Sequence, residues 1–211
     1  MFSYPEADEV LADLGDKVAE AFARSVARTT ADLAEYREIK PSWVSQASER
    51  GLANWIHDRL WYHLTVLLDG VPEVRLVDSE PTREIFVGYR YRLRAKRHGD
   101  EGNVSTFPTP GAIEFLFQPP AQETISGLEE IRLIVGYTWD KEARAMGQAV
   151  LSLRDGKDEI VWLVELPDVG TGYESGTLTP MPVAPEPSTP VIELDSESTS
   201  RGSNTGEDAQ S

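Results

Sequence analysis

A row of basic side chains between residues 90 and 97 is the feature of this sequence best suited to binding chemistry. Apolar and basic residues alternate from Glu84 to His98. In a strand, alternate side chains point to opposite faces, so these cations would share one face at intervals of about 7 Å. Guanidinium groups bind phosphates and carboxylates in a forked geometry. The candidate residues for binding a polyanion or a partner are Arg90, Arg92, Arg94, Lys96 and Arg97.

Other interpretations of this row stay open. A solvated strand face often carries cations that pair with acids on adjacent strands, and Glu114, Glu159 and Glu165 are available for this role. A long charged strand also discourages aggregation through its edge. Tyr89 and Tyr91 would face away from the cations, which weakens the case for stacking nucleic-acid bases. The row therefore predicts a structural role, a protein-binding surface or a polyanion-binding surface.

Trp139 is the candidate for anchoring a partner. It follows the predicted strand 131–138 and precedes a polar loop that begins at Asp140. Tryptophan in such a position can insert into a partner, as aromatic residues do in interface hot spots. The alternative is that Trp139 closes the rim of the core.

Most catalytic chemistry is excluded by residue type. The chain has no cysteine, so a disulfide, a thiolate zinc site, an iron–sulfur cluster and a cysteine nucleophile are ruled out. His57 and His63 lie six positions apart, which does not place them on one helix face. The sequence indicates no catalytic residue, no metal ligands and no cofactor. A small metal-dependent nuclease or hydrolase stays as an alternative if Asp78, Glu114 or Glu130 converge on one pocket.

Two helices are expected to precede the basic row. Apolar residues at three- and four-residue steps predict one helix from Pro5 to about Ile39, ended by Lys40-Pro41. A second helix begins near Ser42 or Ser45 and stops at Asp69-Gly70. The short break between them predicts a helical hairpin.

After residue 73 the apolar residues recur at every second position, which indicates strands. No helix of convincing length separates them, so the sheet should be mainly antiparallel, with about five or six strands. Asp155-Gly156 reads as a hairpin turn. The expected fold class is α+β, with the helical hairpin packed on the sheet. The predicted strands are 74–78, 84–96, 112–118, 131–138, 148–154 and 158–166.

The chain changes character after Pro167. Residues 1–72 and 73–167 form one predicted domain, and residues 168–211 form a tail in which 23 of 44 residues are Gly, Pro, Ser or Thr. The whole chain carries 36 acidic and 20 basic residues, a net charge of −16. Eight of those acids and one base lie in the tail, so it contributes −7. This composition predicts an acidic, disordered tail, in which 190–194 is either a chance apolar patch or a short docking motif.

The expected function is a non-enzymatic cytoplasmic interaction or regulatory module with a protein partner. The acidic start of the chain does not resemble a secretion signal, and no window is apolar enough for a membrane span. Membrane partners are therefore not expected. Nucleic-acid binding through the basic row is the alternative function, and a small metal-dependent nuclease or hydrolase is the second alternative.

Three blocks of the chain resemble small proteins of unknown function from actinobacteria and their phages. The blocks are Tyr89–Arg94, Gly127–Leu133 and Leu151–Asp158, and the resemblance spans most of residues 45–165. It implies a cytosolic setting in a bacterium or phage. No activity follows from it.

Overall fold

The computed structural model describes residues 4–79, 82–99, 101–104, 106, 108–119 and 129–167. The predicted tail, including its apolar segment 190–194, lies outside these residues.

Four helices occupy the N-terminal part, where the sequence predicts two. The first predicted helix is divided at Gly15, and the second is divided at Ala47-Ser48. Ser48 caps the last of the four helices, because its side chain accepts a hydrogen bond of 3.0 Å from the Gly51 amide. The helices are α1 (Ala7–Leu14), α2 (Asp16–Ile39), α3 (Pro41–Gln46) and α4 (Glu49–Leu68).

A six-stranded sheet follows, with its strands in sequence order. All neighbours are antiparallel except β3 and β4, which are parallel from Tyr91 opposite Ile131 to His98 opposite Thr138. The strands are β1 (Val74–Ser79), β2 (Thr82–Val87), β3 (Tyr91–His98), β4 (Ile131–Asp140), β5 (Ala145–Arg154) and β6 (Ile160–Glu165). The α+β prediction, with N-terminal helices on a mainly antiparallel sheet, is confirmed.

The predicted strand 84–96 is wrong as one continuous element. It contains two strands, β2 and β3, joined by a turn at residues 88–90. Ile85 pairs with Leu93 and Val87 pairs with Tyr91, so the chain folds back on itself. Gly88 has a φ of 59°, which is favourable for glycine alone, and it is the signal for this turn. The alternation of apolar residues continues through the turn and therefore hides it.

The predicted strand 112–118 is also wrong, because a short helix, α5 (Pro110–Glu114), and a turn stand there. The Thr109 side chain accepts a hydrogen bond of 3.2 Å from the Ala112 amide, and Pro110 is the first helical residue. A capping threonine followed by proline is a typical helix start. These local signals outweigh the apolar residues that suggested a strand.

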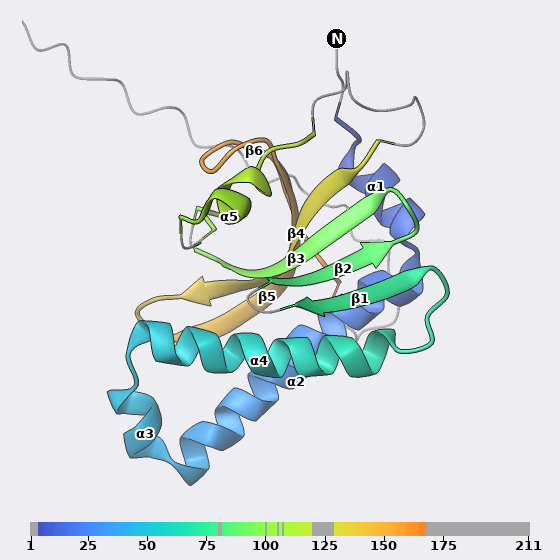
Figure 1. Ribbon diagram of the computed structural model, residues 1–211. Helices are drawn as coiled ribbons and strands as arrows, with labels where there is room; N and C mark the ends of the chain where they lie inside the picture. The colour runs from blue at the N-terminus through green and yellow to red at the C-terminus, as the bar shows by residue number, and fades with distance from the viewer. Residues whose placement is uncertain are drawn as a thin grey trace, which may run out of the picture. The chain divides into compact units, whose positions relative to one another are not determined.

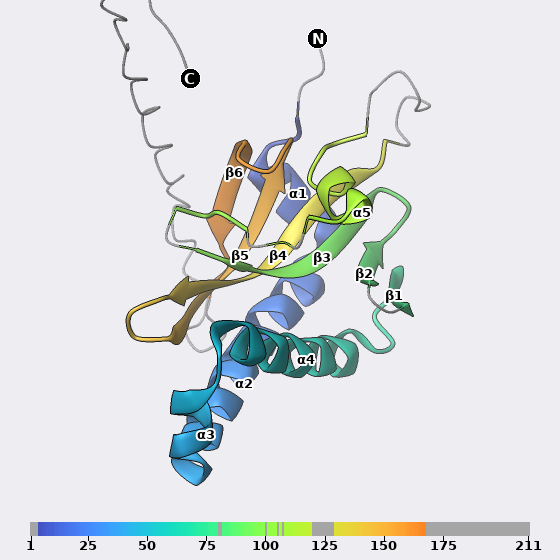
Figure 2. The ribbon, with the colours of Figure 1, turned by 60° about the vertical axis from the view of Figure 1, so that its left-hand side comes forward.

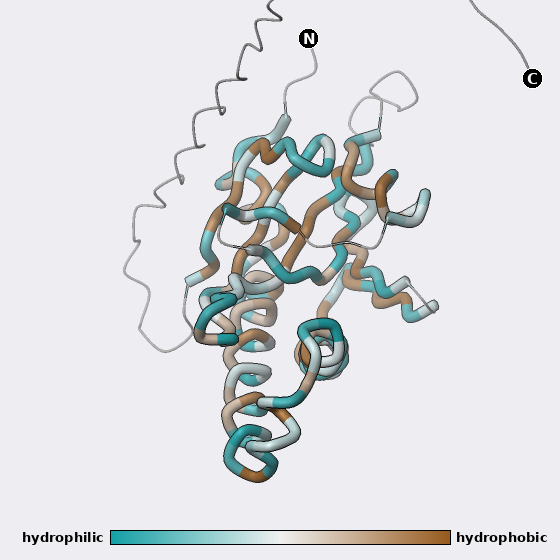
Figure 3. Tube along the Cα trace, turned by 90° about the vertical axis from the view of Figure 1, so that its left-hand side faces the viewer, coloured by the Kyte–Doolittle hydropathy of each residue, from teal (hydrophilic) through white to brown (hydrophobic). Residues whose placement is uncertain are grey.

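The main core lies between the helices and one face of the sheet (Figure 1). Helix residues such as Phe22, Ile56 and Leu64 join Leu93 of β3 and Leu151 of β5 in a single buried cluster. Figure 3 shows hydrophobic residues running along the strands and along α2 and α4. The helices and the sheet therefore share one core.

The opposite face of the sheet has a smaller core. It consists of Ile134 of β4, Val104, and Phe115 and Leu116, which follow α5. Figure 2 shows α5 beside β3 and β4. This arrangement places α5 above the face of β3 that carries Arg92 and Arg94. None of the described helices has the length and apolar character needed to cross a membrane.

Candidate functional site

The five basic candidates do not share one face. Arg92, Arg94 and Lys96 alternate along β3 with the buried residues Leu93 and Ala95. Two candidates depart from this pattern. Arg90 stands in the turn before β3, and Arg97 points toward the helices, where it pairs with Glu49 of α4. The row is therefore divided between three environments.

Glu84 of β2 neutralises the centre of the row. It is only 6% exposed, and one of its carboxylate oxygens accepts hydrogen bonds from Arg92 at 2.7 Å and from Arg94 at 2.6 Å. Burial would raise the pKa of Glu84, but the hydrogen bonds from the two arginines outweigh it and lower the pKa below its usual value. Two of the five candidate cations, Arg92 and Arg94, are therefore already paired with one buried acid.

The same arginines hold α5 against the sheet. The guanidinium carbon of Arg94 lies 4.1 Å from the centre of the Phe115 ring, and those of Arg92 and Arg132 lie within 6.0 Å. Arg94 also donates to the Gly111 carbonyl at 3.2 Å. Arg132 of β4 donates to the carbonyl of Glu114 at 2.8 Å. Carbonyls at a helix end need such donors, so these contacts explain why α5 docks here.

Arg90 and Arg97 are also paired with acids. Arg90 contacts Asp13 of α1 at 2.6 Å, and Glu9 lies 3.3 Å away. Arg97 lies 3.3 Å from Glu49, and its guanidinium covers the Trp139 ring at 5.2 Å. Both arginines therefore tie the helices to the sheet.

Trp139 belongs to the main core. Its side chain is 4% exposed, and its indole nitrogen has no hydrogen-bond partner among the described residues. A partner would reach this ring only after Arg97 moved away from it.

Lys96 is the candidate cation that makes no ion pair within the described part of the chain. Burial and the charge of Arg94 lower its pKa. Burial, together with the nearby charges of Lys96 and Arg83, lowers the pKa of His57 on α4 to about 4. This histidine is neutral at physiological pH.

A buried polar cluster that the sequence does not reveal lies beside the small core. His98, Ser152 and Arg154 are at most 1% exposed, and a His98 ring nitrogen lies 3.0 Å from the Ser152 hydroxyl. Arg154 donates to the carbonyls of Gly102 and Lys157. The cluster therefore ties two loops to the end of β5. It is closed to solvent, which gives a substrate no access.

The corner between α2 and α3 exposes apolar side chains. Ile39 at the end of α2 is 62% exposed, and Trp43 of α3 is 61% exposed. The Lys40 ammonium lies 5.0 Å from the centre of the Trp43 ring. Figures 1 and 2 show the end of α2 and all of α3 extending past the sheet. We call Arg37, Ile39, Lys40, Pro41, Trp43 and Val44 the helical corner.

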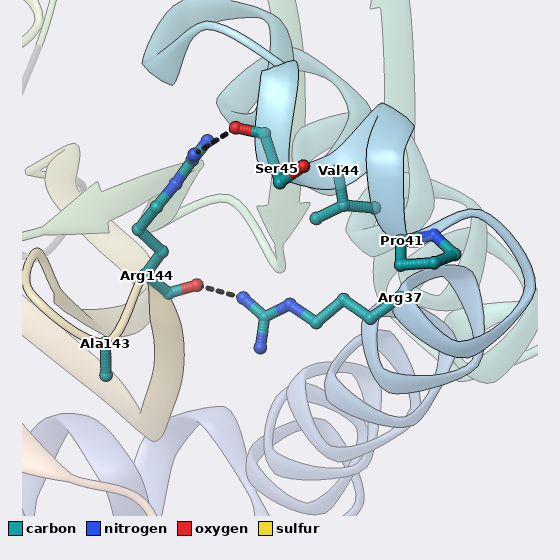
Figure 4. Close-up of a pocket in the computed structure, with 6 residues that line it drawn as sticks. All are labelled: Arg37, Pro41, Val44, Ser45, Ala143 and Arg144. Carbon is teal, nitrogen blue, oxygen red and sulfur yellow. Dashed lines mark hydrogen bonds between the residues drawn. The ribbon is translucent and has the colours of Figure 1, made fainter.

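A pocket of about 280 Å³ lies between the helical corner and the turn that joins β4 to β5 (Figure 4). Its apolar residues are Pro41, Val44 and Ala143. Its polar lining consists of Arg37, Ser45 and Arg144.

Arg144 builds one wall of this pocket. Its φ of 51° is unusual for a residue with a side chain. Its guanidinium donates to the carbonyls of Ser45 at 3.3 Å and Ala47 at 2.8 Å, and Glu49 lies 3.1 Å away. These contacts hold the β4–β5 turn against the helices.

Arg37 forms the facing wall. One nitrogen of its guanidinium donates to the Arg144 carbonyl (Figure 4), and this is the one side-chain hydrogen bond that Arg37 makes among the described residues. Arg37 makes no ion pair with any described carboxylate. The pocket thus offers an apolar floor beside a cation with unused donors.

The acids named for a metal-dependent hydrolase do not meet. Asp78 accepts a hydrogen bond of 2.9 Å from the Trp61 indole and pairs with Arg83. Glu114 and Glu130 both lie near Arg132 on the other face of the sheet. Across the described ranges, no group of three or more His, Asp or Glu residues is arranged to hold a metal ion.

No protein-family model, curated protein or solved structure matches this chain. The function is therefore argued from the residues and their geometry.

The helical corner was missed by sequence reasoning. The sequence pattern places Ile39 at the end of a helix and predicts that Lys40-Pro41 ends that helix. The available signal is Trp43, which follows Ser42 and shares a short segment with the polar residues Ser45 and Gln46. The pocket itself has no local signal, because Arg37 and Arg144 are 107 positions apart in the sequence.

Proposed function

We propose that this protein is a non-enzymatic interaction module that binds a protein partner through the helical corner. The observation that carries the proposal is the exposure of Ile39 and Trp43, four positions apart, beside an open pocket. The proposal keeps the cytoplasmic location expected from the sequence.

Exposed apolar side chains in a cluster are a recognised mark of interaction surfaces. Seven large hydrophobic side chains are exposed in the described part of the chain, and six of them form three pairs of residues four positions apart. The helical corner differs from the other two pairs because its residues Arg37, Pro41 and Val44 also line a pocket. Tryptophan and arginine are also the residues that most often dominate binding energy in interfaces. The seven exposed residues are Ile39, Trp43, Tyr62, Val66, Tyr89, Ile113 and Phe117.

The test is photo-crosslinking in cells of the source organism. A photoreactive phenylalanine analogue replaces Trp43 in one variant and Tyr89 in a control. Tyr89 is 76% exposed, and its turn between β2 and β3 lies at the opposite end of the sheet from α3 (Figure 1). We expect a discrete protein adduct from position 43 alone. The same adducts from both positions, or none from position 43, would refute the proposal.

Polyanion binding is the alternative proposal. It is favoured by the lack of an ion-pair partner for Lys96 among the described residues. The four arginines of the row are paired with Glu9, Asp13, Glu49, Glu84 and Glu130. Binding would therefore depend on Lys96, which makes no ion pair among the described residues.

The alternative is tested with labelled single-stranded DNA at low salt. It predicts binding that weakens as salt rises and that is lost in Lys96→Gln. Absence of binding at low salt removes it.

A further inference from the structure

We infer that the pocket beside the helical corner binds an acidic segment of a partner protein. A large apolar side chain of that segment would contact Pro41, Val44 and Ala143, and an adjacent Asp or Glu would pair with the guanidinium of Arg37. The inference rests on the proposed function and names the chemistry of the partner. The contacts of the pocket residues carry it.

The pocket is preformed, because hydrogen bonds within the protein hold both of the arginines that line it. Arg144 is held by two carbonyls and by Glu49, while its own carbonyl accepts a hydrogen bond from Arg37. Figure 4 shows the Arg37 guanidinium reaching the Arg144 carbonyl, while the Arg144 side chain extends to Ser45 and Val44 and Pro41 lie on the helical side of the pocket. A preformed site of this kind loses little entropy when it binds a ligand.

The size of the pocket favours a side chain over a metabolite. Its volume of about 280 Å³ lies just below the roughly 300–1,000 Å³ that is usual for small-molecule sites. Pro41, Val44 and Ala143 provide the apolar contact that one large side chain needs. The exposed faces of Ile39 and Trp43 would contact neighbouring parts of the same segment.

The charge of the lining selects an acid. Both ionisable residues that line the pocket are arginines. Glu49, which pairs with Arg144 at 3.1 Å, also lies 3.3 Å from Arg97. Arg37 retains guanidinium donors, and a carboxylate is the acceptor that matches their forked geometry. The chain's net charge of −16 does not oppose this, because salt screens charges beyond about 8 Å at physiological ionic strength.

The experiment selects ligands from a random peptide library displayed on phage. The full chain is the bait, and the peptides are displayed as internal segments without a free C-terminus. We expect enrichment of sequences in which Asp or Glu adjoins Leu, Ile, Phe or Trp. A second library with free C-termini separates side-chain acids from a terminal carboxylate, and enrichment in that library alone would overturn the inference.

The best selected peptide is then measured by fluorescence anisotropy against matched variants. Arg37→Glu reverses the pocket charge, and Ala143→Trp fills the opening from an exposed position. Each should weaken binding by at least about tenfold, as expected for the loss of a charge-assisted contact or of the cavity. Lys17→Glu is the control, because Lys17 is an exposed cation at the start of α2 and makes no ion pair within the described residues. It should leave the affinity unchanged.

The outcomes separate this inference from the proposed function. If Trp43→Ala weakens peptide binding and Arg37→Glu does not, the helical corner binds a partner and the inference is wrong. Enrichment of neutral or basic peptides would likewise show that the helical corner binds a partner and that the inference of an acidic segment is wrong. If no peptide is enriched and position 43 gives no crosslink, both fail. A dimer in analytical ultracentrifugation that dissociates in Ala143→Trp would show a second copy in the pocket and would also overturn the inference.

Discussion

Glu84 shows at the scale of single residues why a basic pattern does not identify a binding site. Arg92 and Arg94 both bind its carboxylate, and both lie beside Phe115. Recruiting either arginine to a phosphate would leave a buried acid underpaired, and losing a partner of a buried ion pair costs about 3–5 kcal/mol. Arg37 is the better candidate because it has donors that no residue of the described chain uses.

The acidic partners of the row could not be predicted from the sequence. The alternating pattern predicts one strand over residues 84–96, and in a single strand Glu84 would lie far from Arg92. The turn at Gly88 brings the two side by side. Of the acids that were expected to pair with the row, Glu114 instead lies 3.9 Å from Arg132. The alternation of apolar and basic residues correctly predicts that Arg92, Arg94 and Lys96 alternate with buried residues along β3.

Two histidines should make the stability of the domain depend on pH. Burial lowers the pKa of His98 to about 3, and burial with nearby cations lowers the pKa of His57 to about 4. Both values lie below the unfolded value of about 6.5. The unfolded chain therefore takes up protons first, and this stability is present above about pH 6.5 and is lost as the pH falls toward 4.

We expect the free energy of unfolding to fall by about 2 kcal/mol for each histidine between pH 7 and pH 5. Urea denaturation at the two pH values measures it. His57→Gln and His98→Gln should each remove about half of the difference in unfolding free energy between pH 7 and pH 5. A difference that persists in the double variant would contradict the assignment.

At the scale of elements, the sequence is most informative where local signals and tertiary packing agree. Asp155-Gly156 was predicted as a hairpin turn and lies between β5 and β6. The stop signal Asp69-Gly70 also agrees with the structure, because α4 ends at Leu68.

Two element-scale features could not be read in the same way. The apolar residues of α5 suggested a strand, although Thr109-Pro110 carried the opposite signal. The parallel pairing of β3 with β4 leaves no local pattern, since it depends on where the intervening chain passes.

Arg132 should control the local stability of α5. Its guanidinium donates to the carbonyls of Glu114 at 2.8 Å and Phe117 at 3.3 Å. Arg132→Met removes these bonds, and hydrogen bonds of charged groups contribute about 1.5–3 kcal/mol. We expect amide hydrogen exchange at Phe115 and Leu116 to accelerate by about tenfold or more.

Arg24→Met is the matched control, because within the described residues the ion pair of Arg24 is with Glu20, one turn earlier on the exposed side of α2. It should leave exchange in α5 unchanged. Unchanged exchange in Arg132→Met would show that α5 is held by Phe115 and the small core alone.

At the scale of the molecule, the helices and the sheet share one buried hydrophobic cluster. Val10 of α1 and Leu166 after β6 belong to the same buried cluster. Every buried hydrophobic residue in the described ranges lies between these two positions. Residues 168–211, which carry a net charge of −7, lie outside the described residues.

Truncation after Pro167 should therefore leave the free energy of unfolding unchanged within about 0.5 kcal/mol. Circular dichroism and tryptophan fluorescence should report one coincident transition in both chains. A large loss of stability, or two separate transitions, would show that the tail belongs to the folded domain or that residues 1–72 and 73–167 are independent.

The single parallel contact between β3 and β4 has a consequence for how the chain assembles. On either side of it, three strands are joined in order by short connections, so each half of the sheet can form from its own neighbours in sequence. Joining the halves requires closure of the whole loop from His98 to Ile131, which costs more entropy than any hairpin. We therefore expect the β3–β4 pairing, together with the docking of α1 and α2 on β5 and β6, to form late and to slow folding.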